Sequence, residues 1–437
     1  VGINMPTKTV IFTGFDKFNG SSMRMLYPHE YTQMAGRAGR RGLDTIGHVI
    51  HLNNMFNLPY SHDYEQMVNG NPQTLQSKFS ISYNLVLNFL KFNNNTIDFA
   101  DKSMSNGEIQ RRIQGVTEQI TKMKTDLIAK ETNPSYSYIN EHMDVFENYI
   151  QLKENVKTSK QKARKQMERS IADIESSSKQ FKVQLEQYKS LLVLKDDIRD
   201  NEDYILVLKR HFHNSFHKVV QFLQKYDYIK ERIVLNDNND NIENDMNMNQ
   251  ITVQEKGNVA TYIQETHCLA FTDFLIKTDY LSKFNSYEIV AILSCFTNIR
   301  VKEEKKIHNI SSLTTNMELN ETLESLSIIY EHYMDEELRD GLDKSNNLDY
   351  LFELVNPLLD WCEAEDEKTC KDIMKKCEFE YETFPGEFIK AILKINNMVN
   401  EMKSAAEYMG NVELLHKLTA IPDLTLKFVA TNQSLYV

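Results

Sequence analysis

The spacing of apolar residues changes along the chain, and each change predicts a different element. Residues 9–12 are β-branched or apolar, which is typical of an interior strand of an α/β sheet, and residues 47–52 (GHVIHL) predict the next strand. A helix is expected between the two strands, over about residues 28–39. The first part of the chain is therefore predicted to be the end of an α/β domain.

Residues 73–92 carry apolar side chains at spacings of three and four, which predicts one face of an amphipathic helix pair. These positions are Leu75, Phe79, Tyr83, Leu87 and Leu90. A stripe of this kind is expected to face a core.

Two longer stretches, residues 109–127 and 167–192, alternate spacings of four and three between apolar positions, which is the heptad pattern of a coiled coil. Pro134 and the serine after it predict a turn between the two helices. Residues 107–212 are therefore predicted to form an antiparallel coiled-coil projection. A further apolar helix is expected over about residues 204–226.

The next stretch, residues 236–250 (NDNNDNIENDMNMNQ), is rich in asparagine and aspartate and is predicted to be a disordered loop. Residues 254–260 (QEKGNVA) then suggest a β-turn with Gly257 at its tight position.

The last part, from about residue 251, is predicted to be mostly helical. Ser286 is a candidate N-cap for an apolar helix that ends near residue 296. Residues 383–418 predict a turn, a long helix that stops at Gly410, and another helix.

Composition restricts the class of protein. A chain of 437 residues is long enough for two to four domains. Its net charge of −12 argues against a general nucleic-acid coating protein but allows a local basic channel. Five scattered cysteines without Cys-x-x-Cys pairs, no apolar run of membrane-spanning length and no signal peptide predict an intracellular protein, nuclear or cytoplasmic.

No metal site is expected. His211, His213 and His217 lie close together in the sequence, but only two of them share a helix face, and no acidic or cysteine ligand has a matching spacing. They are interpreted as ordinary histidines on a helix surface.

The strongest chemical signal is residues 30–44 (EYTQMAGRAGRRGLD), where glycines alternate with arginines after an amide. The residues are Gln33, Gly36, Arg37, Gly39, Arg40, Arg41 and Gly42. Glycines let a backbone approach a ligand closely, and guanidinium groups make forked hydrogen bonds to phosphate oxygens. The cluster is suited to stabilise charge on a transferring phosphoryl group.

The pattern Gln-x-x-Gly-Arg-x-Gly-Arg resembles motif VI of superfamily 2 helicases, and residues 2–12 (GINMPTKTVIF) resemble motif V with a strand behind it. The resemblance implies that Arg37 and Arg40 are catalytic and contact the γ-phosphate of ATP. It also implies roles for residues around them. ATP binding is implied for Gln33, Gly36, Gly39, Asn4 and Gly2, and contact with the nucleic-acid backbone for Lys8 and Thr13.

Residues 77–90 (SKFSISYNLVLNFL) resemble the winged helix of superkiller-type exosome-cofactor RNA helicases, which are defined by a C-terminal DSHCT domain. Residues 383–418 are similar to the helical bundle of that domain, whose long helix acts as a ratchet on RNA. Lys390 and Lys394 lie four residues apart on that helix, so the resemblance implies that they contact RNA phosphates.

The implied fold class is an α/β fragment, the end of a second RecA-like domain, followed by a mainly α part. The implied domains are residues 1–56 (RecA-like, motifs V and VI), 57–106 with about 213–260 (winged helix), 107–212 (coiled-coil, arch-like insertion), 236–250 (disordered loop) and 261–437 (DSHCT-like bundle with the ratchet helix). In the family the arch carries a small β-rich domain. No β pattern is present at that place here.

The resemblance implies that the intact protein is an ATP-dependent 3′-to-5′ RNA helicase that unwinds RNA or feeds it to an exosome-like machinery. The expected partners are RNA, a 3′ exonuclease or exosome-like complex and adaptor proteins, with no membrane. The expected cofactors are ATP and Mg²⁺. The sequence contains no Gly-x-x-x-x-Gly-Lys-Ser/Thr loop and no Asp-Glu-x-His box. Magnesium is therefore expected to be held by a first RecA-like domain, and the fragment alone should not hydrolyse ATP.

Two other functions remain open. An archaeal-type DNA-repair helicase shares the RecA, winged-helix and ratchet layout, although it lacks an arch-like insertion. The other is a non-catalytic interaction protein derived from a helicase, in which the coiled coil recruits partners.

Overall fold

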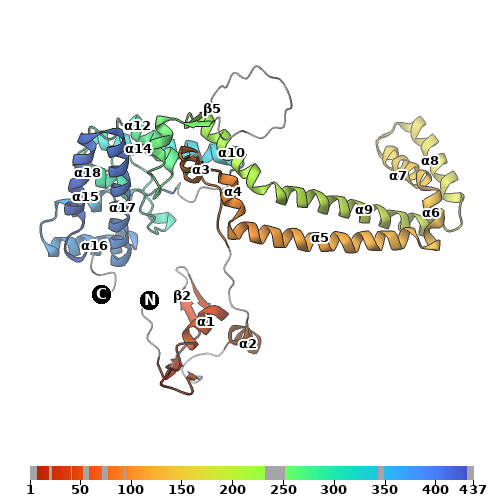
Figure 1. The fold of residues 1–437 in the computed structure, drawn as a ribbon, viewed down its shortest axis with the longest axis horizontal. Helices are drawn as coiled ribbons and strands as arrows, with labels where there is room; N and C mark the ends of the chain where they lie inside the picture. Colours follow the sequence, from red (N-terminus) through yellow and green to blue (C-terminus); the bar gives the residue numbers. More distant parts are fainter. Residues whose placement is uncertain are drawn as a thin grey trace. The chain divides into compact units, whose positions relative to one another are not determined.

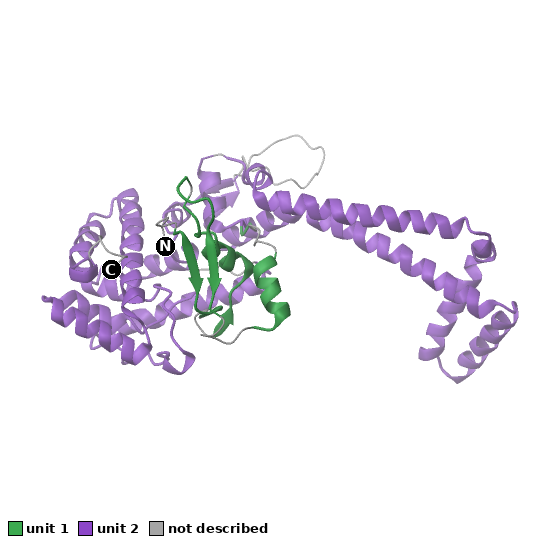
Figure 2. Ribbon diagram, turned by 90° about the horizontal axis from the view of Figure 1, so that it is seen from below, with its two compact units in different colours: residues 1–78 green, residues 79–437 purple. Residues whose placement is uncertain are grey.

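The computed structural model divides into two compact units, residues 1–78 and residues 79–437 (Figure 2). It describes residues 7–18, 22–40, 42–52, 59–70, 77–92, 94–231, 251–342 and 349–430. Residues 57–78, which the sequence groups with the winged helix, lie in the first unit. The predicted disordered loop, residues 236–250, lies outside the described residues.

The first unit is built on two parallel strands, as expected for the end of an α/β domain. Strands β1 (Thr9–Phe12) and β4 (His48–His51) pair so that each residue of one lies opposite its counterpart in the other. Helix α1 (Pro28–Ala35) connects them and ends four residues earlier than predicted, because the chain turns at Gly36. The predicted strands and helix are thus confirmed, with a shorter helix.

The connection between β1 and α1 contains an element that the sequence did not predict. Strands β2 (Asp16–Phe18) and β3 (Met23–Met25) form an antiparallel hairpin before α1. After β4, helix α2 (Ser61–Asn69) packs against α1. The described residues of this unit thus form two helices, a hairpin and a two-stranded parallel sheet.

A small aromatic core holds this unit together. Its buried members are Phe12, Phe15, Leu26, Tyr31 and Met67. By contrast, the side chains of Ile11, Val49 and Ile50 on the two strands are exposed.

The second unit is mainly helical, as expected (Figure 1). Its helices up to residue 225 are α3 (Tyr83–Lys91), α4 (Thr96–Asp101), α5 (Met104–Glu131), α6 (Ser137–Glu141), α7 (Met143–Thr158), α8 (Gln161–Ser176), α9 (Phe181–Lys209) and α10 (His211–Lys225). Those after residue 250 are α11 (Glu255–Ala260), α12 (Cys268–Lys277), α13 (Ser286–Ser294), α14 (Met317–Arg339), α15 (Val355–Glu363), α16 (Glu367–Tyr381), α17 (Pro385–Met409) and α18 (Val412–Thr425). Short 3-10 turns cover Pro134–Tyr136, Glu303–Lys305 and Phe428–Ala430.

The predicted helix pair over residues 73–92 is only partly correct. A single helix, α3, begins at Tyr83, and residues 77–82 before it are not helical. The hydroxyl of Ser82 caps the helix by accepting a hydrogen bond from the backbone N–H of Leu85 (3.3 Å). A serine in this position competes for backbone hydrogen bonds and favours a helix start over a helix interior, so Phe79 packs from the preceding loop.

Helices α5 and α9 lie side by side as an antiparallel pair (Figure 1). Two ion pairs fix their direction, because residues further along α5 pair with residues earlier on α9. Lys124 Nζ lies 2.6 Å from Glu202 Oε1, and Lys195 Nζ lies 2.9 Å from Glu131 Oε1.

The second predicted heptad stretch does not form one helix. It is divided between α8, which packs on α7, and α9, with a break at residues 177–180. Three successive serines end α8, and the hydroxyl of Ser177 donates to the carbonyl of Ile174 (2.7 Å). Serine hydroxyls compete with helical hydrogen bonds, which is why apolar spacing alone missed the break.

Helices α6, α7 and α8 lie at one end of the α5–α9 pair (Figure 1). Together with the first turns of α9 they bury a small core of their own, separate from the main core of the unit. Phe146 stands at its centre, with ring centroids 5.6 Å from Phe181 and 5.2 Å from Tyr188. No strand occurs among these helices in the described residues, as the sequence predicted.

The predicted β-turn at residues 254–260 is wrong, because these residues form helix α11. The strands are instead β5 (Ile229–Glu231) and β6 (Ile251–Val253), which pair antiparallel just before it. Gly257 lies against the backbone carbonyl of Tyr228, where a Cβ atom would collide. The glycine is needed for close helix packing and not for a turn.

The helices after residue 260 share one continuous core with α3, α10 and α11. Asn285, and not the predicted Ser286, caps α13, since its side chain accepts from the N–H groups of residues 287 and 288. The predicted order of long helix, glycine stop and second helix is confirmed in α17, Gly410 (φ 68°) and α18.

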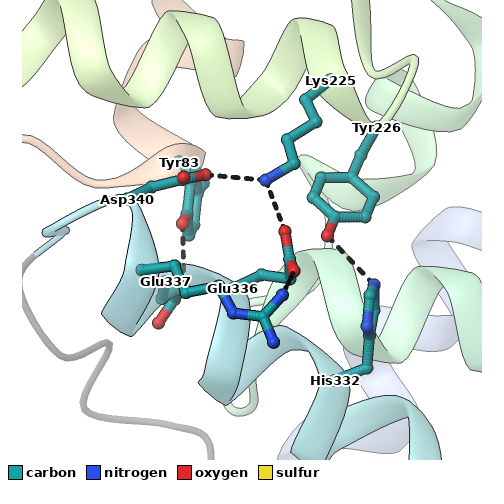
Figure 3. Close-up of polar contacts among 8 residues, drawn as sticks. Tyr83, Lys225, Tyr226, His332, Glu336, Glu337 and Asp340 are labelled. Carbon is teal, nitrogen blue, oxygen red and sulfur yellow. Dashed lines mark hydrogen bonds and ion pairs between the residues drawn. The ribbon is translucent and has the colours of Figure 1, made fainter.

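Polar contacts join α14 to α3 and α10, and those to α3 are buried (Figure 3). The hydroxyl of Tyr83 donates to Glu337 Oε1 (2.7 Å), and His267 Nε2 lies 2.8 Å from the same oxygen. Lys225 pairs with Glu336 and with Asp340 at the edge of this network. Burial, followed by the nearby Glu337 carboxylate, raises the pKa of Tyr83 far above its usual range.

Candidate nucleotide and nucleic-acid site

The arginine- and glycine-rich motif forms a tight turn after α1 in the first unit. Its backbone is tied to Thr7, two residues before β1, because Thr7 N–H donates to the carbonyl of Arg37 (2.9 Å) and Gly39 N–H donates to the carbonyl of Thr7 (2.6 Å). These two hydrogen bonds fasten the predicted motif VI to the segment that follows the predicted motif V. We call residues 36–44 the arginine turn.

Glycines allow the arginine turn to close. Gly39 and Gly42 have φ angles of 91° and 82°, which side chains with a Cβ atom rarely adopt. Gly47 passes against the carbonyl of Ala38, so closely that a Cβ atom there would collide with it. The glycines therefore allow the backbone of the turn to adopt these angles and allow residue 47 to pack directly against it.

The two predicted catalytic arginines differ in their surroundings. Arg37 is partly buried, whereas the side chain of Arg40 is 46% exposed and makes a forked ion pair with Asp44. Arg40 Nε donates to Asp44 Oδ2 (2.8 Å) and Nη2 donates to Oδ1 (3.1 Å). This pair raises the pKa of Arg40 and lowers that of Asp44 to about 2.

The structure brings most of the predicted nucleotide residues together. Gln33 lies exposed on the last turn of α1, and Gly36, Arg37, Gly39 and Arg40 follow it directly. The predicted ATP-binding residues Gly2 and Asn4, and Arg41, lie outside the described residues.

Lys8 and Thr13, predicted to contact nucleic acid, lie at opposite ends of β1 and are both exposed. Lys8 is close enough to Asp44 to contribute to the lowering of its pKa. Lys8 therefore lies beside the arginine turn. Thr13 is separated from it by the length of the strand.

A charged cluster that the sequence analysis missed fixes the start of α1. Arg24 on β3 makes a forked ion pair with Glu30 (2.7 and 2.9 Å), and Lys17 on β2 lies 2.8 Å from the same carboxylate. Glu30 also accepts from the N–H of Tyr27 (2.9 Å), which completes a capping box. Hydrogen bonding to Arg24 is the main cause that lowers the pKa of Glu30 far below its usual range.

The sequence contains a signal that places Glu30 at the start of a helix. Proline at the first helical position, followed two residues later by glutamate, marks a helix start, and Pro28 and Glu30 show this pattern. The partners of Glu30 could not be found this way, because they come from the hairpin that the sequence did not predict.

The second predicted group of cations lies on α17 in the second unit. Lys390 is exposed, whereas Lys394 is partly buried near Glu265 and Glu401. Burial lowers the pKa of Lys394, and the two carboxylates oppose this effect. The two lysines share a helix face, but only Lys390 is fully open to solvent.

The face of α17 around Lys394 packs on the loop after α11. Glu401 accepts hydrogen bonds from the backbone N–H groups of Gln264 (2.9 Å) and Glu265 (3.1 Å). Asn397 Nδ2 donates to Glu265 Oε1 (3.2 Å). These contacts hold the predicted ratchet helix against the part of the unit that contains α3 and α11.

Lys91, the last residue of α3, lies over two tyrosine rings near the end of α17. Its Nζ is 4.9 Å from the ring centroid of Tyr262 and 5.3 Å from that of Tyr408. The two rings are 5.7 Å apart. This cation–π cluster joins α3 to α17, in addition to the contacts between α17 and the loop after α11.

The three histidines interpreted as surface residues, His211, His213 and His217, are exposed on α10. Nowhere in the part of the chain that the structure describes do three histidine, cysteine or acidic side chains lie grouped as a metal would need. All five cysteines are buried as free thiols. Among the described helices, none combines the length and apolar composition that a membrane crossing requires.

Comparison with known protein families finds a match within the second unit. Residues 250–430 match the DSHCT (NUC185) domain family. This stretch contains α11 to α18, with the predicted ratchet helix among them.

Three relatives are similar to shorter parts of the chain. The antiviral helicase SKI2 of Saccharomyces cerevisiae is 48% identical over 92 residues, which are 21% of this chain and 7% of that protein. Human superkiller complex protein 2 is 48% identical over 91 residues, again 21% and 7%. The human exosome RNA helicase MTR4 is 39% identical over 121 residues, which are 28% of this chain and 11% of that protein.

These similarities confirm the resemblance to superkiller-type, DSHCT-domain exosome-cofactor RNA helicases. The matched stretches nevertheless span only about a tenth or less of each relative's length. The activity of a whole helicase is therefore a proposal for this chain.

Proposed function

We propose that this chain is part of an ATP-dependent 3′-to-5′ RNA helicase that unwinds RNA or feeds it to an exosome-like degradation machinery. The observation that carries the proposal is the arginine turn, which is fastened to the segment before β1 and carries Arg37 and Arg40, with Gln33 just before it on α1. The DSHCT match and the RNA helicases among the relatives support the same function. The 3′-to-5′ direction comes from the family resemblance.

The residues of the arginine turn fit one side of an ATP site. A guanidinium has five N–H donors, and the ion pair with Asp44 uses two of those on Arg40, so three remain for phosphate oxygens. Gln33, Gly36 and Gly39 would line the same side, with Gly2 and Asn4 from the predicted motif V. ATP supplies the phosphoryl group whose transfer drives movement on RNA.

The described residues contain no cluster suited to Mg²⁺. A metal that bridges phosphates is usually held by one or two carboxylates. In the proposed enzyme these ligands belong to a first RecA-like domain, and the arginine turn acts from the opposite side. The role of Arg37 and Arg40 would be to stabilise charge that develops on the transferring phosphoryl group.

For the second unit we propose the domain assignment that the resemblance implies. The elements α3, α4, α10, α11 and the β5–β6 hairpin would form the winged helix, and residues 261–437 the helical bundle. The helices from α5 to α9 would be an arch-like insertion whose end is helical. Lys390 and Lys394 on α17, with Lys8 and Thr13 of the first unit, would contact the RNA backbone.

Unwinding assays on the intact protein test this proposal. A duplex with a 3′ single-stranded overhang should be unwound with ATP when the loading strand is RNA, and a 5′ overhang should not support unwinding. The same duplexes made of DNA provide the control. Preference for DNA would favour a DNA-repair helicase, and the lack of any ATP-dependent unwinding would favour a non-catalytic interaction protein.

A further inference from the structure

Asp44 is the residue of the arginine turn to which neither the sequence motif nor the comparisons give a role. Its carboxylate accepts three hydrogen bonds from Arg40, two from the guanidinium and one from the backbone N–H (3.0 Å). In return, the carbonyl of Arg40 accepts from the N–H groups of Leu43 (3.0 Å) and Asp44 (2.9 Å). The two residues therefore form a closed ring of contacts that fixes both backbone and side chain.

The two partners are exposed to very different degrees. The side chain of Asp44 is only 7% exposed, whereas that of Arg40 is 46% exposed. The carboxylate is thus packed into the turn, and it holds an arginine that reaches solvent. An arrangement with a fixed anion and an exposed cation is suited to orient the cation toward a ligand.

The geometry of the fork decides which edge of Arg40 is available. Asp44 occupies the edge formed by Nε and Nη2. Both N–H groups of Nη1 and one of Nη2 point away from the carboxylate, because the guanidinium is planar with fixed donor directions. One edge is therefore anchored by protein, and the opposite edge can take two phosphate oxygens.

The carboxylate is ionised at any working pH, since hydrogen bonding to Arg40 lowers the pKa of Asp44 to about 2. A free arginine side chain loses considerable rotamer entropy when it is fixed by a ligand. A second partner that fixes it beforehand reduces that cost at the moment of reaction.

We propose that Asp44 is a positioning residue for Arg40, holding the guanidinium by one edge so that its other edge meets the γ-phosphate. The inference rests on the proposed function, because it concerns the same ATP site. Asp44 itself touches no substrate. Its effect passes entirely through Arg40.

A double-mutant cycle in the intact helicase tests the proposal. Asp44→Asn keeps the shape of the side chain but removes its charge. We expect kcat for ATP hydrolysis to fall on the order of 10- to 100-fold, the usual effect of removing a partner that orients a functional group, with little change in KM. In an Arg40→Ala background, Asp44→Asn should cause no further loss.

The cycle distinguishes positioning from a structural role. If Asp44 only stabilised the fold, Asp44→Asn would lower activity equally with or without Arg40. Asp44→Glu retains the charge at a longer reach and should restore part of kcat. This variant keeps the test informative if Asp44→Asn lowers the melting temperature. The matched control is Asp63→Asn on α2, an exposed aspartate in the same unit, which should leave kcat unchanged.

The possible failures are separable. If Arg40→Ala hydrolysed ATP at the normal rate, the proposed ATP site itself would be wrong. If Arg40→Ala were inactive but Asp44→Asn behaved as the parent protein, only the positioning role would be overturned. A faster reaction or tighter ATP binding in Asp44→Asn would show that Asp44 competes with phosphate, which also contradicts the proposal.

Discussion

The arginine turn and the network around α14 hold polar groups in opposite ways. On the turn, Arg40 reaches solvent and keeps free hydrogen-bond donors. In the network, Tyr83 and Glu337 are buried and hydrogen-bonded to each other (Figure 3). Exposed polar groups with spare donors are available to a ligand, whereas buried groups that are hydrogen-bonded to each other stabilise the fold. The two regions should therefore respond differently to substitution.

The largest effect is expected on the turn. Arg40→Ala in the intact protein should lower ATP hydrolysis on the order of 10³-fold or more, since an arginine finger stabilises charge in the transition state. Its melting temperature should also fall, because the packed carboxylate of Asp44 loses its ion-pair partner, so ATP hydrolysis is compared per folded molecule. Steady-state ATPase and thermal unfolding measure the two quantities. The control is Arg112→Ala, an exposed arginine on α5; equal activity in both variants would contradict the comparison.

The reverse behaviour is expected in the network. Tyr83→Phe removes one of the two donors to Glu337 Oε1 in a buried place, and should cost roughly 1–3 kcal/mol of unfolding free energy. ATP hydrolysis per folded molecule should remain unchanged. Tyr204→Phe removes the hydroxyl of an exposed tyrosine on α9 and serves as the control. The comparison fails if urea unfolding gives both variants the same stability.

Within about one turn, helix α17 carries one exposed lysine and one partly buried lysine. The exposed Lys390 should contribute a full phosphate contact, so that Lys390→Ala lowers the slope of log K against log salt for single-stranded RNA by about 0.7. Lys394 is partly buried beside Glu265 and Glu401, so Lys394→Ala should change the slope less. Lys376→Ala on α16 is the matched control. Normal RNA binding and unwinding in a variant that carries both Lys390→Ala and Lys394→Ala would exclude these two lysines from the mechanism.

The smallest effect is expected from His51, a partly buried polar group in the same unit as the arginine turn. Its ring lies between the hydroxyls of Tyr31 (3.2 Å) and Tyr64 (2.5 Å), and burial lowers its pKa. The unfolded chain therefore takes up a proton more readily than the folded chain. Stability should be complete above the usual histidine pKa of about 6.5 and decrease as the pH falls through the folded value.

Hydrogen exchange of α1 amides, corrected for the intrinsic pH dependence, measures this effect. Protection should decrease on acidification in the parent chain and much less in a His51→Gln variant, whose side chain keeps hydrogen-bonding groups but does not titrate. The same decrease in both proteins would exclude His51 as its cause.

The elements that the sequence predicted well are those with long, regular patterns and clear ends. The strands β1 and β4 were identified from their apolar runs, and α17 from its length and its stop at Gly410. The breaks that were missed, at Ser82 and at Ser177, depend on single serine side chains. Apolar periodicity continues across such positions, so it cannot show where a hydroxyl ends a helix.

The candidate site shows the same division. Gln33, Arg37 and Arg40 were found from a motif in which spacing and chemistry are local. Asp44 is also local, four residues from Arg40, but nothing in the sequence shows that its carboxylate is packed into the turn. The difference between Lys390 and Lys394 depends on the burial of Lys394 near Glu265, which lies more than a hundred residues away in the sequence.

By itself, the sequence indicated the class of this chain and the groups proposed to react, because glycine conformation, guanidinium chemistry and helix spacing are properties of short segments. Only the tertiary structure decided which of the charged groups are anchored, which are buried and which remain available to a ligand. The physical reason is that burial and electrostatic partners arise from contacts between distant segments. Short-range patterns show which face of a segment is apolar, but not which charged groups another segment buries or pairs.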